Sequence, residues 1–323
     1  MTTATPPTLY PLRFEPGYQY RLWGGRQLAE FLPGPLPSGF VGEAWLLSDR
    51  EDQQSRVADG PLAGQTLGDL CTRWPVQLLG GAAGQFPRFP LLLKFLDARE
   101  MLSVQVHPSD DQAAAAGHTD TGKTEAWVVL DAAPDSCIYA GLKPGTTPED
   151  LRRAVARTTV TDHLASFTPR AGDVVLLPAG TVHALGGGVV VFEVQQNSDL
   201  TYRLYDWNRV DRAGQRRELQ IDQALACTDF AARPVVPVRP VDDELFSCAQ
   251  FGIRRLEGKV RVDVGAAGTA RVLVCIAGAG ALEYNGATFG VRKGDVVLLP
   301  AAVGACAFQP EVAATLLEVS LPL

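Results

Sequence analysis

Two of the four histidines in this chain of 323 residues lie where they could bind a metal. His183 follows Gly172, Pro178 and Gly180, a spacing in which the first glycine opens a hairpin, the proline ends a strand and the second glycine lets the chain turn back. That turn would direct His183 into the interior of a barrel. For this motif alone, a core histidine that hydrogen-bonds a backbone carbonyl is the alternative.

The second histidine ends a strand-like stretch, residues 103–107, with the sequence SVQVH. Alternation places Ser103, Gln105 and His107 on one face of the strand and the two valines on the other. If the polar face lines a barrel, three buried polar side chains are costly unless something binds them. A metal is the usual compensation.

A glutamate completes the candidate ligand set. Glu125 begins another predicted strand, residues 125–130, and Lys123 shares its face. Two histidines and one glutamate that point inward supply nitrogen and oxygen ligands, which suit either zinc or non-haem iron.

An internal repeat indicates how these residues are positioned. The segment RAGDVVLLPAG, which starts at Arg170, recurs as RKGDVVLLPAA from Arg292. Each copy contains a Gly-Asp turn, a short apolar strand, a proline that ends it and a later valine-rich strand, which predicts two copies of a small β-barrel module. Alignment of the prolines puts Ala305 where His183 stands, so we expect a metal in the first module only.

Prolines and acidic residues separate the two copies. Residues 233–240 read RPVVPVRP and an acidic run follows at 242–244, so we predict a catalytic, metal-binding domain over 1–235 and a degenerate, metal-free domain over 236–323. Thr147, followed by PED, predicts a helical insertion near 148–157 in the first domain. Residues 65–70 and 112–116 are weaker helix candidates.

The composition is that of a globular, β-rich protein. Hydrophobic residues make up 46% of the chain, and short valine-rich and leucine-rich runs lie between its 32 glycines and 23 prolines. The formal net charge of -7 argues against nucleic acid as a partner, because binding a phosphate backbone needs clustered excess lysine and arginine. A small anion needs only a few well-placed cations and stays possible.

Nothing in the sequence indicates export, a membrane or an obligate protein partner. The first twelve residues lack a basic region followed by an apolar one, so no signal peptide is expected. The longest uncharged stretch, residues 174–192, contains a proline and three consecutive glycines and is therefore interpreted as buried strands with a turn. The six cysteines form no CxxC pair, which favours reduced thiols in a cytoplasmic protein.

Several motifs carry a resemblance to a known family. GDVVLLPAGTVHALGG is similar to the second motif of the cupin superfamily, apart from Gly187 where many cupins have asparagine. The early WGG at Trp23, PLLLKFLDAREMLSVQVHPSD, GKTEAWVVLDA and LLPAGTVHALGGGVVVFEVQQNSDLTYRLYDWNR resemble the class I mannose-6-phosphate isomerases in their short bacterial form. The resemblance runs from about residue 10 to 225. Gln220 departs from the histidine common in the family, at a position that is not a ligand.

The resemblance implies a fold, a metal and an essential arginine. The implied fold is mainly β, with two tandem cupin (jelly-roll-like) barrels. One Zn²⁺ per chain is expected on His107, Glu125 and His183, with Gln105 as the fourth ligand of the longer relatives. Arg203 corresponds to the essential arginine of the family.

The resemblance also implies substrate contacts. Lys94, Ser103 and Lys123 are expected near the substrate phosphate, and Glu193 is a candidate for proton transfer. Lys94 lies in an apolar strand where an unpaired charge is expensive, so an anionic partner would explain it. An ion pair with a nearby carboxylate such as Asp97 is the alternative.

From the residues alone, Arg203 could instead be a surface residue that forms a salt bridge with Asp199 or Asp206. The family resemblance favours the catalytic interpretation. Glu193 faces the opposite side of its strand from Phe192 and Val194, and a buried carboxylate there fits a base.

The predicted reaction is interconversion of mannose 6-phosphate and fructose 6-phosphate. Moving a proton between adjacent carbons through an enediol needs a base, a group that stabilises the enediolate and a grip on the phosphate. Two other functions share these residues: a cupin dioxygenase that uses iron on the same triad, and a sugar-phosphate sensor without turnover. The lysines and Gln105 favour the isomerase over the dioxygenase.

Overall fold

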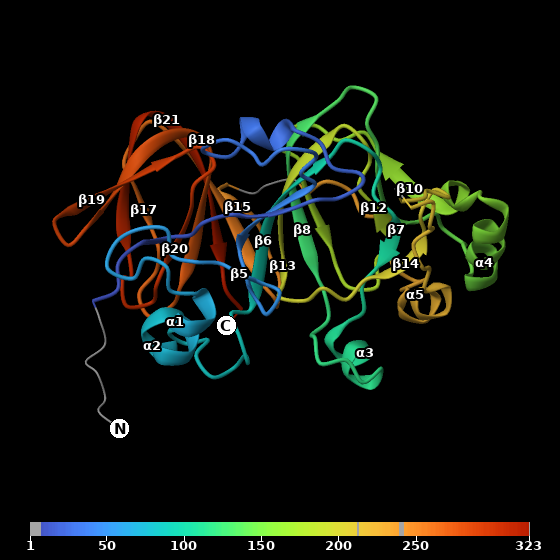
Figure 1. The fold of residues 1–323 in the computed structure, drawn as a ribbon, viewed down its shortest axis with the longest axis horizontal. Helices are drawn as coiled ribbons and strands as arrows, with labels where there is room; N and C mark the ends of the chain where they lie inside the picture. The colour runs from blue at the N-terminus through green and yellow to red at the C-terminus, as the bar shows by residue number, and fades with distance from the viewer. Residues whose placement is uncertain (1–7, 212, 239–241, 323) are drawn as a thin grey trace.

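The computed structural model describes residues 8–211, 213–238 and 242–322. The start of the N-terminal segment and residues 239–241 of the predicted domain boundary lie outside the described residues. The chain forms two β-rich lobes that lie side by side, with β6 and β13 between them (Figure 1).

Two facing sheets build the first lobe. One has the order β11-β8-β13-β6-β3-β2. Its strands are β11 (Val174–Leu177), β8 (Glu125–Ala132), β13 (Val189–Gln196), β6 (Leu91–Ala98), β3 (Glu43–Leu47) and β2 (Gly17–Gln19). The other has the order β10-β9-β12-β7-β14. Its strands are β10 (Leu164–Phe167), β9 (Ile138–Leu142), β12 (His183–Ala184), β7 (Val104–Val106) and β14 (Tyr202–Tyr205).

The second lobe contains a sheet with the order β1-β20-β18-β21-β16-β15, with β17 on β21 and β19 on β18. Its strands are β1 (Leu12–Arg13), β20 (Val296–Leu299), β18 (Arg271–Tyr284), β21 (Cys306–Ser320), β16 (Gly252–Gly258), β15 (Glu244–Ser247), β17 (Val262–Val264) and β19 (Ala287–Arg292). Leu12 of β1 pairs with Leu298 of β20, so a strand from the start of the chain lies in the sheet of the C-terminal lobe.

Strands β6 and β13 carry mostly apolar residues on both faces because they separate two cores. Phe192 and Val194 of β13 join a core that also contains Val272 and Val319 of the second lobe. Val191, on the opposite face, packs in a core inside the first lobe. Since alternate residues share a face, Glu193 of β13 and Lys94 of β6 point into the first lobe.

The predicted mainly β architecture is confirmed, with one difference in shape. The sheets do not close into barrels and instead pack as sandwiches, with apolar cores between them. The uncharged stretch 174–192 forms β11, β12 and the start of β13, as predicted, and all six cysteines are free. Within the described ranges, no helix is long and apolar enough to cross a membrane.

The three predicted helices begin where their N-cap residues stand in the sequence. Helix α4 (Pro148–Arg157) matches the prediction and begins with a capping box between Thr147 and Asp150. Helices α1 (Leu67–Arg73) and α3 (Asp110–Ala115) are displaced by a few residues from the predicted 65–70 and 112–116, because Thr66 and Ser109 are their N-caps. The remaining short elements are α2 (Pro75–Leu79), α5 (Ile221–Cys227), η1 (Gln27–Glu30), η2 (Val160–His163), β4 (Asp49–Arg50) and β5 (Gln53–Gln54).

Candidate metal centre and active site

Strand pairing brings the two predicted histidines together. In β12, His183 pairs with Gln105 of β7, and His107 directly follows β7. Gly180, with φ of 85°, makes the turn before β12, and its N–H donates to the His107 carbonyl at 2.8 Å. The two imidazole rings lie with their centroids 5.0 Å apart.

Backbone carbonyls determine which ring nitrogens face the site. The Nδ1 of His107 is 2.7 Å from the Leu200 carbonyl and the Nδ1 of His183 is 2.9 Å from the Thr181 carbonyl. A carbonyl only accepts, so each Nδ1 donates, and the Nε2 lone pair of a neutral ring is free to bind a metal. His183 does hydrogen-bond a backbone carbonyl, as expected for a core histidine, but only through Nδ1. Its Nε2 faces Glu125.

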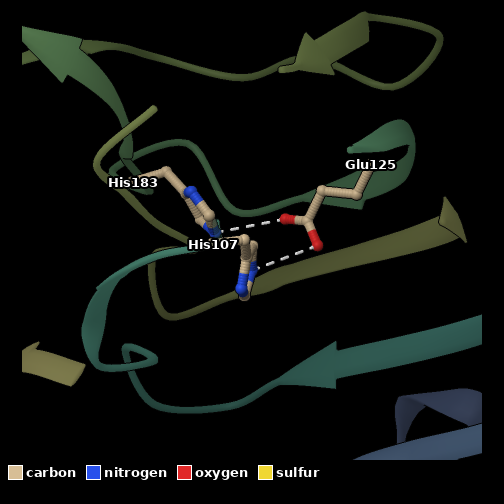
Figure 2. A group of neighbouring side chains, drawn as sticks. All are labelled: His107, Glu125 and His183. Atoms are coloured by element: carbon tan, nitrogen blue, oxygen red, sulfur yellow. Dashed lines mark ion pairs between the residues drawn. The ribbon is translucent and has the colours of Figure 1, made fainter. Parts of the chain in front are cut away.

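The Glu125 carboxylate faces both Nε2 atoms (Figure 2). Its Oε1 is 3.1 Å from Nε2 of His183 and its Oε2 is 3.5 Å from Nε2 of His107. All three side chains are buried, and their candidate ligand atoms lie within 4.8 Å of one another. The Lys123 ammonium is 2.9 Å from Oε2 of Glu125.

The protonation states of the triad residues suit the binding of a cation. Burial, together with Lys123, lowers the pKa of His107 to about 3, so its ring is neutral at pH 7. Burial would raise the pKa of Glu125, but Lys123 and the two histidines hold it well below its usual value. A lone pair of His107 therefore faces a carboxylate, and its Nε2 has no hydrogen-bond partner among the described residues. Two imidazoles and a carboxylate are a fitting donor set for a divalent metal.

Gln105 and Ser103 extend the polar face as the alternation predicts. The Gln105 amide reaches to 3.3 Å from Nε2 of His183, and its Oε1 is 3.4 Å from the Ser103 hydroxyl. The structure therefore places Gln105 beside the triad. Whether it ligates a metal stays a prediction.

A cavity of about 500 Å³ adjoins the triad. Every predicted site residue outside the triad lines it, namely Lys94, Ser103, Gln105, Lys123, Glu193 and Arg203. The wall also includes Tyr20, Trp23, Glu43 and Arg217. The fold thus gathers residues from distant parts of the chain around one polar space.

Lys94 is paired with two carboxylates, neither of them Asp97. Its Nζ lies 3.4 Å from Oε1 of Glu193 and 3.7 Å from Oε2 of Glu43. The suggested partner Asp97 is wrong because that side chain points to the other face of β6 and accepts from the Gln27 N–H at 2.6 Å. Lys94 is therefore a buried charge with built-in counter-ions.

One oxygen of Glu193 accepts a hydrogen bond, and among the described residues the other has only the ion pair with Lys94. The Trp127 indole N–H donates to its Oε2 at 2.9 Å, while Oε1 has no hydrogen-bond partner among the described residues. Burial and the nearby Glu125 charge raise the pKa of Glu193. A buried carboxyl with a raised pKa and an oxygen that makes no hydrogen bond is suited to proton transfer.

Arg203 points to the cavity and not to a surface salt bridge. Its Nε donates to the Ser103 hydroxyl at 3.3 Å, and burial with Arg217 lowers the pKa of its guanidinium. No ion pair joins Arg203 to a carboxylate within the described ranges. The alternative partner Asp206 is engaged by Arg209 and by Arg217, whose Nε is 2.7 Å from Oδ2.

Sequence reasoning missed Glu43 and Arg21. The Arg21 Nε donates to Oε1 of Glu43 at 2.7 Å, and both residues line the cavity. A signal was present, because Glu43 is the one charged residue in the apolar run VGEAWLL at 41–47. Arg21 has no comparable signal, since it lies in the loop after β2 and its partner is 22 residues away in β3.

Comparison with known proteins decides the family. Residues 12–127 match the family model described as phosphomannose isomerase type I, catalytic domain. The chain is 35% identical over 304 residues to mannose-6-phosphate isomerase ManA of Bacillus subtilis, covering 92% of this chain and 95% of that protein. This chain belongs to the type I phosphomannose isomerases.

Other relatives extend the same picture. A mannose-6-phosphate isomerase of Streptococcus mutans is 33% identical over 298 residues, covering 90% of this chain and 92% of that protein. The crystal structure of the mannose 6-phosphate isomerase from Bacillus subtilis superposes with a TM-score of 0.86 at 28% identity, covering 96% and 99% of the two chains. The predicted family and cupin-type fold of this phosphomannose isomerase are thereby confirmed.

The second lobe lacks the triad. Among residues 8–211, 213–238 and 242–322, the group His107, Glu125 and His183 is the one set of three side chains placed to hold a metal. Ala305 stands in the loop of the second copy. A single metal per chain and the division at residue 235 stay predictions.

Proposed function

We propose that this chain interconverts mannose 6-phosphate and fructose 6-phosphate. The observation that carries the proposal is one polar cavity lined by Glu193, Arg203, Gln105 and Lys123, of which Gln105 contacts His183 and Lys123 contacts Glu125 of the triad. Relatives that cover most of this chain bear the name mannose-6-phosphate isomerase, which supports the choice of substrate.

Glu193 is proposed to move the proton. In the aldose-to-ketose direction a proton leaves C2 of the open-chain sugar and returns at C1, while a hydroxyl proton passes from the C2 oxygen to the C1 oxygen. Oε1 of Glu193 can accept and return the carbon-bound proton, because Trp127 occupies only Oε2 and Oε1 itself accepts no hydrogen bond from the described residues. Its raised pKa makes it a better base than an exposed carboxylate.

Cations around the cavity are proposed to hold the substrate. Arg203 would stabilise negative charge that develops on the substrate oxygens in an enediol intermediate. Lys123 and Ser103 offer an ammonium and a hydroxyl to the anionic substrate. Lys94 also lines this space, but its two carboxylate partners leave it the least available of these groups for a phosphate.

The metal proposed for the triad is Zn²⁺, held by His107, Glu125 and His183, with Gln105 as a fourth ligand. It would act as a Lewis acid that orients and polarises substrate oxygens without redox chemistry. Carbonyl contacts at both Nδ1 atoms fix the tautomers that such binding needs.

The test is an isomerase assay on purified protein, with the metal content measured on the same preparation. Interconversion of the two hexose phosphates with about one zinc per chain supports the proposal. Oxygen consumption that depends on added iron, with no interconversion, would instead show a cupin dioxygenase. Tight sugar-phosphate binding without turnover would indicate a sensor.

A further inference from the structure

A row of cross-strand partners runs through the wall of the active-site cavity. Trp45 of β3 pairs with Lys94 of β6, Lys94 pairs with Glu193 of β13, and Glu193 pairs with Trp127 of β8. Directly paired residues of neighbouring strands project from the same face of a sheet. The strands β6, β13 and β8 lie side by side in the first lobe (Figure 1).

Glu43 adds a second carboxylate to this row. It lies two residues before Trp45 on β3 and therefore on the same face. The Trp45 indole N–H donates to Oε2 of Glu43 at 2.6 Å, just as the Trp127 indole donates to Oε2 of Glu193 at 2.9 Å. Two carboxylates, each anchored by an indole, thus flank the one ammonium of Lys94.

The distances show that Lys94 is shared between them. Its Nζ is 3.7 Å from Glu43 and 3.4 Å from Glu193, and both contacts are longer than the roughly 2.8 Å of a direct charge-assisted hydrogen bond. The Trp45 ring also holds the ammonium, with Nζ 5.0 Å from its centroid. As a result, Oε1 of Glu193 stays without a hydrogen bond.

Glu43 is well fixed for such a role. Its other oxygen accepts from Arg21 Nε at 2.7 Å, and the side chain is only 10% exposed. Lys94 and Arg21 overcome the effect of burial and lower the pKa of Glu43 to about 2, so it keeps its negative charge at pH 7.

We propose that Glu43 is a positioning residue for the isomerase reaction, which holds the Lys94 ammonium away from Glu193 and so leaves Oε1 of Glu193 free to move the substrate proton. Without the Glu43 charge, Lys94 closes onto Glu193 and occupies that oxygen. The catalytic part of this inference rests on the function proposed above, whereas the placement of Lys94 does not.

The kinetic test is a double-mutant cycle of Glu43→Gln and Lys94→Met. We expect Glu43→Gln to lower kcat at least tenfold with KM within about threefold, because the change disables proton transfer while the cations proposed to hold the substrate stay in place. In the Lys94→Met background, Glu43→Gln should change kcat by less than about threefold, since no ammonium remains to block Glu193. Glu43→Asp, which keeps the charge, should retain more activity than Glu43→Gln.

A matched control separates positioning from stability. Glu318 of the second lobe is a carboxylate of similar burial that accepts from the Gly265 N–H at 2.6 Å and pairs with Arg254. Glu318→Gln should lower the melting temperature and leave kcat unchanged. An unchanged kcat in Glu43→Gln, or the same fold-loss with and without Lys94, would overturn the proposal.

A crystal structure of Glu43→Gln gives a readout independent of turnover. The proposal expects Lys94 Nζ within about 3 Å of Oε1 of Glu193, at direct hydrogen-bond distance. An ammonium that keeps its central position would overturn the proposal even if kcat falls. If the unsubstituted protein does not interconvert the hexose phosphates, the proposed function fails, and this crystallographic result still decides whether Glu43 positions Lys94.

Discussion

Lys123 would compete with a metal at the triad for the Glu125 carboxylate. The ammonium lies 2.9 Å from Oε2 of Glu125, which is also one of the oxygens facing the histidines. Both side chains are almost fully buried, at 5% and 1% exposure. We therefore predict that Lys123→Met, which removes the charge at similar length, tightens metal binding while it impairs turnover.

The expected gain in metal affinity can be worked out from the Glu125 carboxylate that the substitution leaves without its ammonium partner. Removing one partner of a buried ion pair costs about 3–5 kcal/mol when the other charge stays uncompensated. In the metal-free variant the Glu125 carboxylate is left as an uncompensated buried charge. In the metal-bound variant the metal compensates that charge, so metal binding becomes more favourable than in the unsubstituted protein. If the metal offsets about 2 kcal/mol, the dissociation constant falls by roughly thirtyfold, since about 1.4 kcal/mol corresponds to a factor of ten.

The assay is a competition titration of Zn²⁺ between the protein and a chromophoric chelator at about pH 8, where the Glu125 carboxyl stays ionised. Lys143→Met is the matched control, because the exposed Lys143 ammonium contacts only the Asp162 carbonyl among the described hydrogen bonds. We expect at least tenfold tighter binding in Lys123→Met, at least tenfold lower kcat/KM for mannose 6-phosphate, and no change in the control. Unchanged or weaker metal binding in Lys123→Met would refute the competition argument.

Three further substitutions test the site and its support. Arg203→Ala should lower kcat about a hundredfold and change the free energy of unfolding by no more than about 1 kcal/mol; unfolding with full turnover in the folded fraction would show a structural role instead. His183→Ala should weaken metal binding more than tenfold in the chelator titration, and unchanged affinity would remove it from the ligand set. Gly186→Ala should lower the melting temperature far more than Gly187→Ala. A Cβ at 186 would lie 1.8 Å from the Cys137 carbonyl oxygen, whereas the nearest atom to a Cβ at 187, the Arg99 carbonyl oxygen, is 3.2 Å away. Equal melting temperatures of the two variants would contradict the described packing.

The chemistry of the site was readable where residues close in sequence carry it. Gly180 precedes His183 by three residues, and Ser103, Gln105 and His107 alternate along β7 and the residue on either side of it, so local spacing predicts their common face. The helix predicted near 148–157 is confirmed, and its start could be predicted because its N-cap and first proline are adjacent in sequence.

Contacts between residues far apart in the sequence could not be predicted. Lys94 finds its counter-ions on β3 and β13, 51 and 99 residues away, so the nearest carboxylate in sequence, Asp97, was the wrong partner. The pairing of Leu12 with Leu298 likewise spans almost the whole chain, and no local pattern distinguishes it from other apolar strands. Local propensity specifies the elements, whereas the choice between apolar partners is made by the packed core.

The most direct test of the account is to strip the purified protein of metal and measure mannose 6-phosphate turnover. Turnover is measured again after zinc is restored, and the zinc content of the reconstituted protein is determined by elemental analysis. The account predicts loss of interconversion on stripping and recovery at about one zinc per chain, with no recovery in His183→Ala. Full activity in the stripped protein, or recovery that needs two metals per chain, would contradict a single His107, Glu125 and His183 centre in the first lobe.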